Sequence, residues 1–226
     1  MNRSFLIGVL SMLLVAGLAE AQTSELTPST PDKIPPGPLV ITKLPHFAQW
    51  TIDYTYANAP KPGMPSLKSQ RPVRVVMTRT GVTIHEETTF EQGLQGEIWS
   101  NDRFVVEKSP NLKPIATLQL GGGDDFPDFD WVARDNFVGT QSLEGRKCLV
   151  FSKKQFTSTG DFLGMAHAYV DFTSRLPVQY ELPSETQKYT IQPPPSEELS
   201  LPDDIIAAAK AMVTQVQRAT PHLAPP

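Results

Sequence analysis

Alternation of apolar and polar residues is the feature that most constrains how this chain folds. Trp50, Ile52, Tyr54 and Tyr56 alternate with polar residues, a pattern that gives a β-strand one apolar face. Further strand-like runs cover residues 73–78, 82–88, 97–100, 103–107, 115–120, 137–141, 146–153, 166–172, 177–182 and 188–192. The turns between several of them are short, and glycines such as Gly81 and Gly145 favour tight hairpins because glycine readily adopts a positive φ.

A succession of short strands and short turns predicts an antiparallel meander instead of alternating strands and helices. One helix is predicted at about residues 203–219, where Ile206, Ala209 and Val213 recur at helical spacing and Ser200 or Asp203 can cap the first turn. The expected fold class is therefore mainly β: a curved antiparallel sheet or half-open barrel meander with a C-terminal helix.

Prolines mark the expected domain boundaries. Eleven of the 22 prolines lie in three clusters: before residue 39, at residues 193–195 and at the C-terminus. We interpret residues 22–44 as a proline-rich linker, 45–192 as the β domain, and 193–226 as a proline-rich segment with the helix and a disordered tail. We expect residues 22–44 and 221–226 to be disordered or extended, because they bury too little apolar surface to offset chain entropy.

Residues 1–21 have the features of a secretory signal peptide. Arg3 precedes an apolar run that ends in Ala19, Glu20 and Ala21, a small-x-small cleavage pattern. The apolar run is shorter than the about 20 residues that a membrane-spanning helix needs. We expect a mature chain that begins at Gln22, has no membrane span and is exported to a periplasmic or extracellular location.

Charge and cysteine content narrow the class of protein. The formal net charge is -4, whereas a nucleic-acid-binding domain needs a basic surface to contact phosphates, so no nucleic-acid partner is expected. A single cysteine, Cys148, cannot form an internal disulfide. Cys148 lies in a strand-like run, and we expect it to be a buried apolar side chain.

The densest group of charged residues follows three glycines. Its four carboxylates are Asp124, Asp125, Asp128 and Asp130. Several oxygen ligands in a loop suit calcium, but the spacing is not that of an EF-hand. The interpretation that we favour is structural: one aspartate caps a helical turn, three aromatic residues between 126 and 131 pack on the core, and the carboxylates stay in water. We therefore expect no metal site and no cofactor, with these four aspartates as the minor alternative.

No catalytic motif is found in the sequence. It contains neither a Gly-x-Ser-x-Gly elbow nor a zinc-binding pair of histidines at i and i+4. The expectation is that the protein is not an enzyme, while a catalytic site assembled from distant residues stays an open alternative.

Two stretches near the end of the β domain resemble a known family. Residues 145–151 form a glycine followed by a strand, and residues 168–178 form a strand that ends in Asp171, a Thr-x-x-Leu-Pro turn and a return strand. This pattern resembles the LolA-like outer-membrane lipoprotein carrier superfamily and its uncharacterised exported relatives. The resemblance implies a strongly curved antiparallel sheet around an apolar groove, covered by helices.

The expected function follows from these features together. The leading hypothesis is an exported non-enzymatic domain that binds an apolar or lipid-like ligand on a curved β-sheet. The alternative is a structural or protein-interaction module of the cell envelope, with a second envelope protein as the partner. A hydrolase is the least favoured interpretation.

Overall fold

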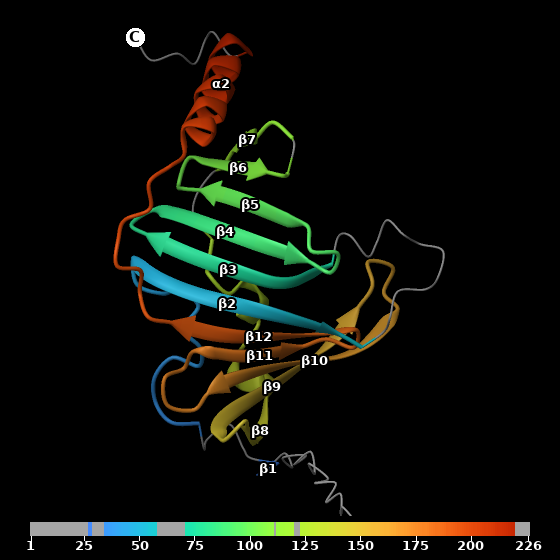
Figure 1. Ribbon diagram of the computed structural model, residues 1–226. Coiled ribbons are helices and arrows are strands. Elements are labelled where there is room, and N and C mark those ends of the chain that lie inside the picture. Colours follow the sequence, from blue (N-terminus) through green and yellow to red (C-terminus); the bar gives the residue numbers. More distant parts are fainter. Residues whose placement is uncertain (1–26, 29–33, 58–70, 111, 120–122, 220–226) are drawn as a thin grey trace, which may run out of the picture.

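The structure is a computed structural model that describes residues 27–28, 34–57, 71–110, 112–119 and 123–219. The expected signal peptide and the expected tail at 221–226 lie outside the described residues. Within the described part, twelve strands form one antiparallel sheet that does not close on itself, and a helix follows (Figure 1). The prediction of a mainly β fold with a C-terminal helix is confirmed.

The strands and the helix lie close to the predicted segments, except for β1, which falls in the segment predicted as a linker. Their bounds are β1 Thr27–Pro28, β2 Phe47–Tyr56, β3 Pro72–Thr80, β4 Thr83–Phe90, β5 Gln95–Ser100, β6 Phe104–Lys108, β7 Ile115–Leu118, β8 Phe137–Leu143, β9 Arg146–Phe156, β10 Phe162–Asp171, β11 Pro177–Glu181, β12 Glu185–Gln192 and α2 Asp203–Ala219. The hairpin turns contain the expected glycines, and Gly81 and Gly145 have φ angles of 61° and 79°.

The sheet consists of two meanders joined side by side. Strands β2 to β7 pair in sequence order, as do β8 to β12, and β12 pairs with β2 through registers such as Tyr189 opposite Ile52. Residues 123–136, here called the crossover segment, lead from the end of the first meander to the start of the second. We call the face of the sheet that the crossover segment covers the inner face, and the opposite one the outer face.

The main hydrophobic core lies between the inner face and the crossover segment. Trp50, Phe151, Phe126 and Phe129 are almost fully buried there. Trp131 is partly buried and packs against the same cluster. These positions confirm the prediction that the aromatic residues of this segment attach it to the core. Burial of such large aromatic rings contributes much of the stability of a core.

The folded body begins earlier than predicted. Ile34 and Leu44 are buried in the main core, and Leu39 and Val40 pack against it. The N–H of Ile41 also donates to the carbonyl of Arg175 at 2.8 Å. Residues 34–44 are therefore part of the domain and not of a linker, because their apolar side chains bury enough surface to outweigh the proline content around them.

Helix α2 forms a second core on the outer face, over β5 to β7. Ile205 and Ala209 pack there with Trp99 and Val106. Lys108 of β6 holds the start of the helix through an ion pair between its Nζ and Asp204 Oδ2 at 3.1 Å. Figure 1 shows α2 at the β7 end of the sheet, with the rest of the helix extending away from the strands.

Cys148 belongs to a third, smaller cluster with Val150 and Tyr169. It is fully buried, as predicted. Burial raises the pKa of its thiol to about 11, which keeps the thiol protonated and inert at neutral pH.

Candidate functional site

The four aspartates of the crossover segment lie in different environments. Asp124 and Asp130 are exposed, Asp128 is half-buried, and the carboxylate of Asp125 is only 2% exposed. The prediction that all four side chains stay in water is thus wrong for Asp125 and Asp128. Their local sequence is typical of solvated turn residues. The neighbouring aromatic residues Phe126 and Phe129 are buried in the core, and this places the two aspartates against it as well.

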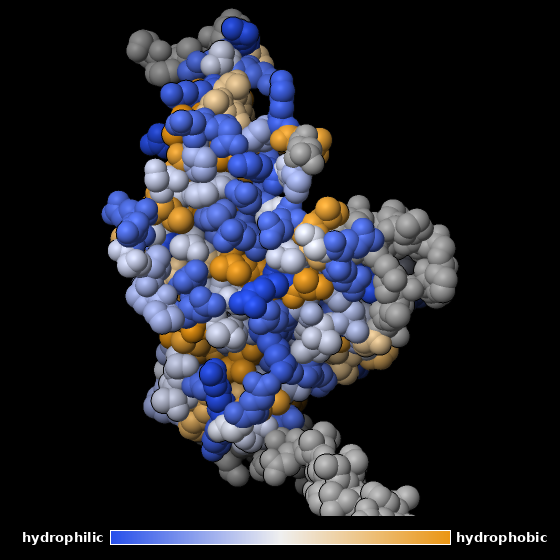
Figure 2. Space-filling model, viewed as in Figure 1, coloured by the Kyte–Doolittle hydropathy of each residue, from blue (hydrophilic) through white to orange (hydrophobic). Residues whose placement is uncertain are grey.

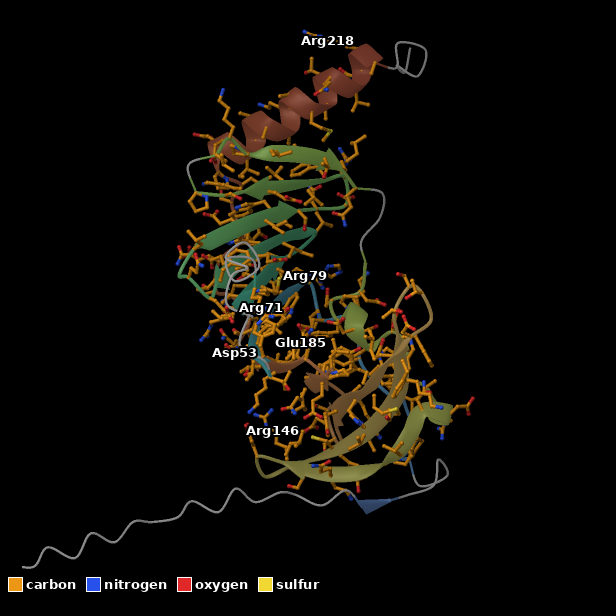
Figure 3. All side chains as sticks on the ribbon, turned by 90° about the vertical axis from the view of Figure 1, so that its right-hand side faces the viewer. Asp53, Arg71, Arg79, Arg146, Glu185 and Arg218 are labelled. Atoms are coloured by element: carbon orange, nitrogen blue, oxygen red, sulfur yellow. The ribbon has the colours of Figure 1, made fainter. Side chains whose placement is uncertain are left out.

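Asp125 forms a buried ion pair with Arg79 of β3. Its second oxygen accepts the N–H of Leu44 at 2.6 Å, and Arg79 donates to the carbonyl of Leu44 at 3.2 Å. This arrangement joins three segments that are distant in sequence: the N-terminal segment, β3 and the crossover segment. In Figure 3, Arg79 is labelled near the middle of the sheet, beside the crossover segment. The role of this group is structural.

Asp128 faces a group of polar side chains on the inner face. Its Oδ2 lies 3.3 Å from the hydroxyl of Tyr189, which also donates to Gln187 Oε1 at 2.6 Å. Burial raises the pKa of the Asp128 carboxyl above its usual range, although the Tyr189 hydroxyl partly opposes that shift. Burial therefore disfavours the ionised form of Asp128, which is the form that a cation would need.

No group of three or more His, Cys, Asp or Glu side chains within the described ranges is placed to hold a metal ion. We predict that millimolar calcium leaves the melting temperature unchanged, because a ligand stabilises a fold only by occupying a native site. Calcium at 100 times its dissociation constant would add about 2.7 kcal/mol. Thermal melts with calcium and with a chelator measure the difference. A calcium-dependent rise that Asp128→Asn and Asp130→Asn abolish would overturn this prediction.

In the described part of the chain, a groove on each face of the sheet is a candidate ligand site. The first, here called the inner groove, has a volume of about 680 Å³ and lies over β3 to β6, beside the part of the inner face that the crossover segment fills. Val75, Phe90 and Ile98 supply apolar surface, whereas Glu86, Glu97 and Glu107 place three carboxylates along it against one cation, Lys108. The lining is therefore mixed, and its carboxylates disfavour an anionic ligand.

The second groove, here called the helix groove, lies between α2 and the strands β6 and β7. It has a volume of about 830 Å³, within the roughly 300 to 1,000 Å³ of small-molecule sites. Its apolar lining residues are Phe104, Leu118, Leu201, Ile206, Ala209, Met212 and Val213. Figure 2 shows orange, apolar atoms among blue ones around α2 and β7.

The helix groove exists because the apolar stripe of α2 is wider than its contact with the sheet. Ile205 and Ala209 point into the second core, but Val213, one turn further along, is 44% exposed. Leu118 on β7 is 54% exposed on the other side of the groove. The sequence predicted the apolar stripe of this helix but not the groove, which depends on how α2 crosses the end of the sheet.

The rim of the helix groove is polar. Asp102, Arg103, Gln119, Lys210 and Thr214 lie along it. The turn with Arg103 is fixed by Asn101, whose Oδ1 accepts the N–H groups of Arg103 and Phe104 at 2.8 and 3.0 Å. An apolar floor with a polar rim is the usual composition of a site for an amphipathic ligand.

Comparison with known proteins gives no relative from which a function can be transferred: no protein-family model matches the chain, and no curated protein matches it. None of the described helices is long and apolar enough to cross a membrane. The grooves themselves therefore carry the functional argument.

Proposed function

We propose that the protein is an exported, non-enzymatic binding domain that holds an apolar or lipid-like ligand in the helix groove. The observation that carries the proposal is a groove of about 830 Å³ with a mainly apolar lining. Exposed apolar surface of this kind is costly in water, and covering it with an apolar ligand contributes about 25 cal/mol for each Å² buried. Export by the N-terminal segment and likeness to the LolA-like carriers are parts of this proposal.

The structure favours the helix groove over the inner face as the place of binding. A large part of the inner face packs against the protein's own aromatic residues, Phe126 and Phe129. The remaining inner groove is lined by four charged side chains, Glu86, Glu97, Glu107 and Lys108. An apolar ligand in the inner groove would remove water from these charged side chains, which costs free energy. In the helix groove the charged side chains lie at the rim, so this cost is smaller.

The experiment titrates the purified protein with N-phenylnaphthylamine, a neutral apolar probe that fluoresces when bound. We expect saturable binding that Leu118→Ser and Val213→Ser each weaken by about tenfold, because each removes about 1.5 kcal/mol of apolar contact. Ile115→Ser is the matched control: Ile115 lies on the same strand as Leu118 and is 63% exposed, but it does not line the groove. Absence of saturable binding, or an equal loss with the control, would refute the proposal.

A second candidate function, a protein-interaction module, rests on a different surface. The hairpin of β9 and β10 carries four large apolar side chains that are well exposed: Phe156, Phe162, Leu163 and Met165. The rings of Phe156 and Phe162 contact each other with their centroids 5.8 Å apart. Exposed aromatic and methionine side chains are enriched in protein interfaces. Phe156→Ser with Phe162→Ser would abolish capture of an envelope protein under this hypothesis and leave probe binding in the helix groove intact.

A further inference from the structure

We infer that the helix groove selects an amphiphile with an acyl chain and an anionic head group. This inference rests on the proposed function, because it names the chemical class of the ligand at the same site. The acyl chain occupies the apolar floor formed by Leu118, Ile206 and Val213, and the head group lies at the rim beside Arg103 and Lys210.

The two rim cations carry the choice of an anionic head group. Arg103 comes from the turn between β5 and β6, and Lys210 comes from the middle of α2, so the cations approach the groove from its two walls. Neither forms an ion pair with any other described residue. Lys108, the other lysine near the base of the helix, already binds Asp204. An anionic head group would give both rim cations a partner.

The rim has two cations and one carboxylate, so its local charge is positive. Asp102 opposes the two cations, so the described rim carries a formal charge of one positive unit from Arg103, Lys210 and Asp102. The protein as a whole has a net charge of -4. The helix groove is therefore a positively charged place on an acidic protein, which favours an anion there over a neutral or cationic head group.

Gln119 lies on the same rim, on the β7 side of the groove. Its main-chain N–H donates to the carbonyl of Arg103 at 3.1 Å, which holds the end of β7 beside the turn that carries Arg103. Its side-chain Oε1 is buried and has no hydrogen-bond partner among the described residues, so it is not open to a ligand in the groove and has no part in the choice of head group.

The test compares three ligands with the same chain length: dodecanoate, dodecanol and dodecyltrimethylammonium. Each displaces N-phenylnaphthylamine from the full protein at low salt and at a pH where dodecanoate is ionised. We expect dodecanoate to bind most tightly. Arg103→Gln and Lys210→Gln should each weaken dodecanoate binding by roughly twofold to fivefold, the effect of an exposed ion pair, without changing dodecanol binding.

The matched control is Arg218→Gln. Arg218 lies on the same helix as Lys210 but at its far end, away from the sheet, as labelled in Figure 3. The Arg218→Gln substitution removes one positive charge from α2, as Lys210→Gln does, but it does not change the groove. Dodecanoate binding should therefore stay unchanged. Equal weakening by Arg218→Gln and Lys210→Gln would reduce the effect to the overall charge of the helix and overturn the inference.

The outcomes separate the two proposals. Equal affinity for dodecanoate and dodecanol, with loss of both in Leu118→Ser, would overturn the anionic head group and leave apolar binding in place. Tighter binding of dodecyltrimethylammonium would also overturn it and assign the dominant role to Asp102. Failure of all three ligands to displace a bound probe would overturn the inference and leave apolar binding in place, whereas no binding of the probe itself would overturn the inference together with the proposed function.

Discussion

Replacing Asp125 with asparagine should lower the free energy of unfolding by about 3 to 5 kcal/mol, because it leaves the guanidinium of Arg79 buried without a counter-charge. Arg79 is 7% exposed in its side chain and Asp125 is 2% exposed. Burial lowers the pKa of Arg79, because this position removes water from its cation. Urea unfolding followed by tryptophan fluorescence measures the change as a shift in midpoint at constant m.

A double variant distinguishes the ion pair from general damage to the core. Arg79→Met combined with Asp125→Asn removes both charges and keeps an oxygen that accepts the N–H of Leu44. It should cost less than the sum of the single variants, by about 1 to 3 kcal/mol. The control is Lys188→Gln, which breaks the exposed pair of Lys188 with Glu144 and should change stability by less than about 1 kcal/mol. Strictly additive single variants would contradict the interpretation of a coupled buried pair.

The strands and turns were predictable from the sequence because they depend on local patterns. The alternation of apolar and polar residues in β2 indicates which side chains face the core. Gly81 and Gly145 indicate where the chain adopts a positive φ. The aromatic residues of the crossover segment were equally informative, since a loop gains nothing from Phe126 and Phe129 unless they are buried. These features need no knowledge of what lies opposite in space.

The buried ion pair and the start of the domain were not predictable in the same way. Asp125 looks like a solvated turn residue until Arg79, far away in sequence, is placed beside it. Residues 34–44 look like a linker by proline content, although Ile34 and Leu44 were a visible signal of burial. The helix groove depends on the angle between α2 and the sheet, which no single segment encodes.

Replacing Phe126 with alanine should also lower the free energy of unfolding by about 3 to 5 kcal/mol, because it removes a fully buried aromatic ring and leaves a cavity. Trp131→Ala should cost less, since Trp131 is only partly buried at the edge of the core. Phe156→Ala is the matched control: Phe156 is 54% exposed, and its loss should change stability by no more than about 0.5 kcal/mol. Urea unfolding of the three variants gives the comparison.

The position of Phe126 makes this variant a test of how the two meanders hold together. Its ring contacts Trp50 of β2 at a centroid distance of 5.8 Å and Tyr189 of β12 at 5.7 Å. These are the two strands whose pairing joins the meanders. If the crossover segment stabilises that joint, wild-type unfolding is a single transition, and Phe126→Ala lowers the stability of both halves together. Two separate transitions in the wild-type protein, or a Phe126→Ala loss confined to one half of the sheet, would contradict that role of the crossover segment.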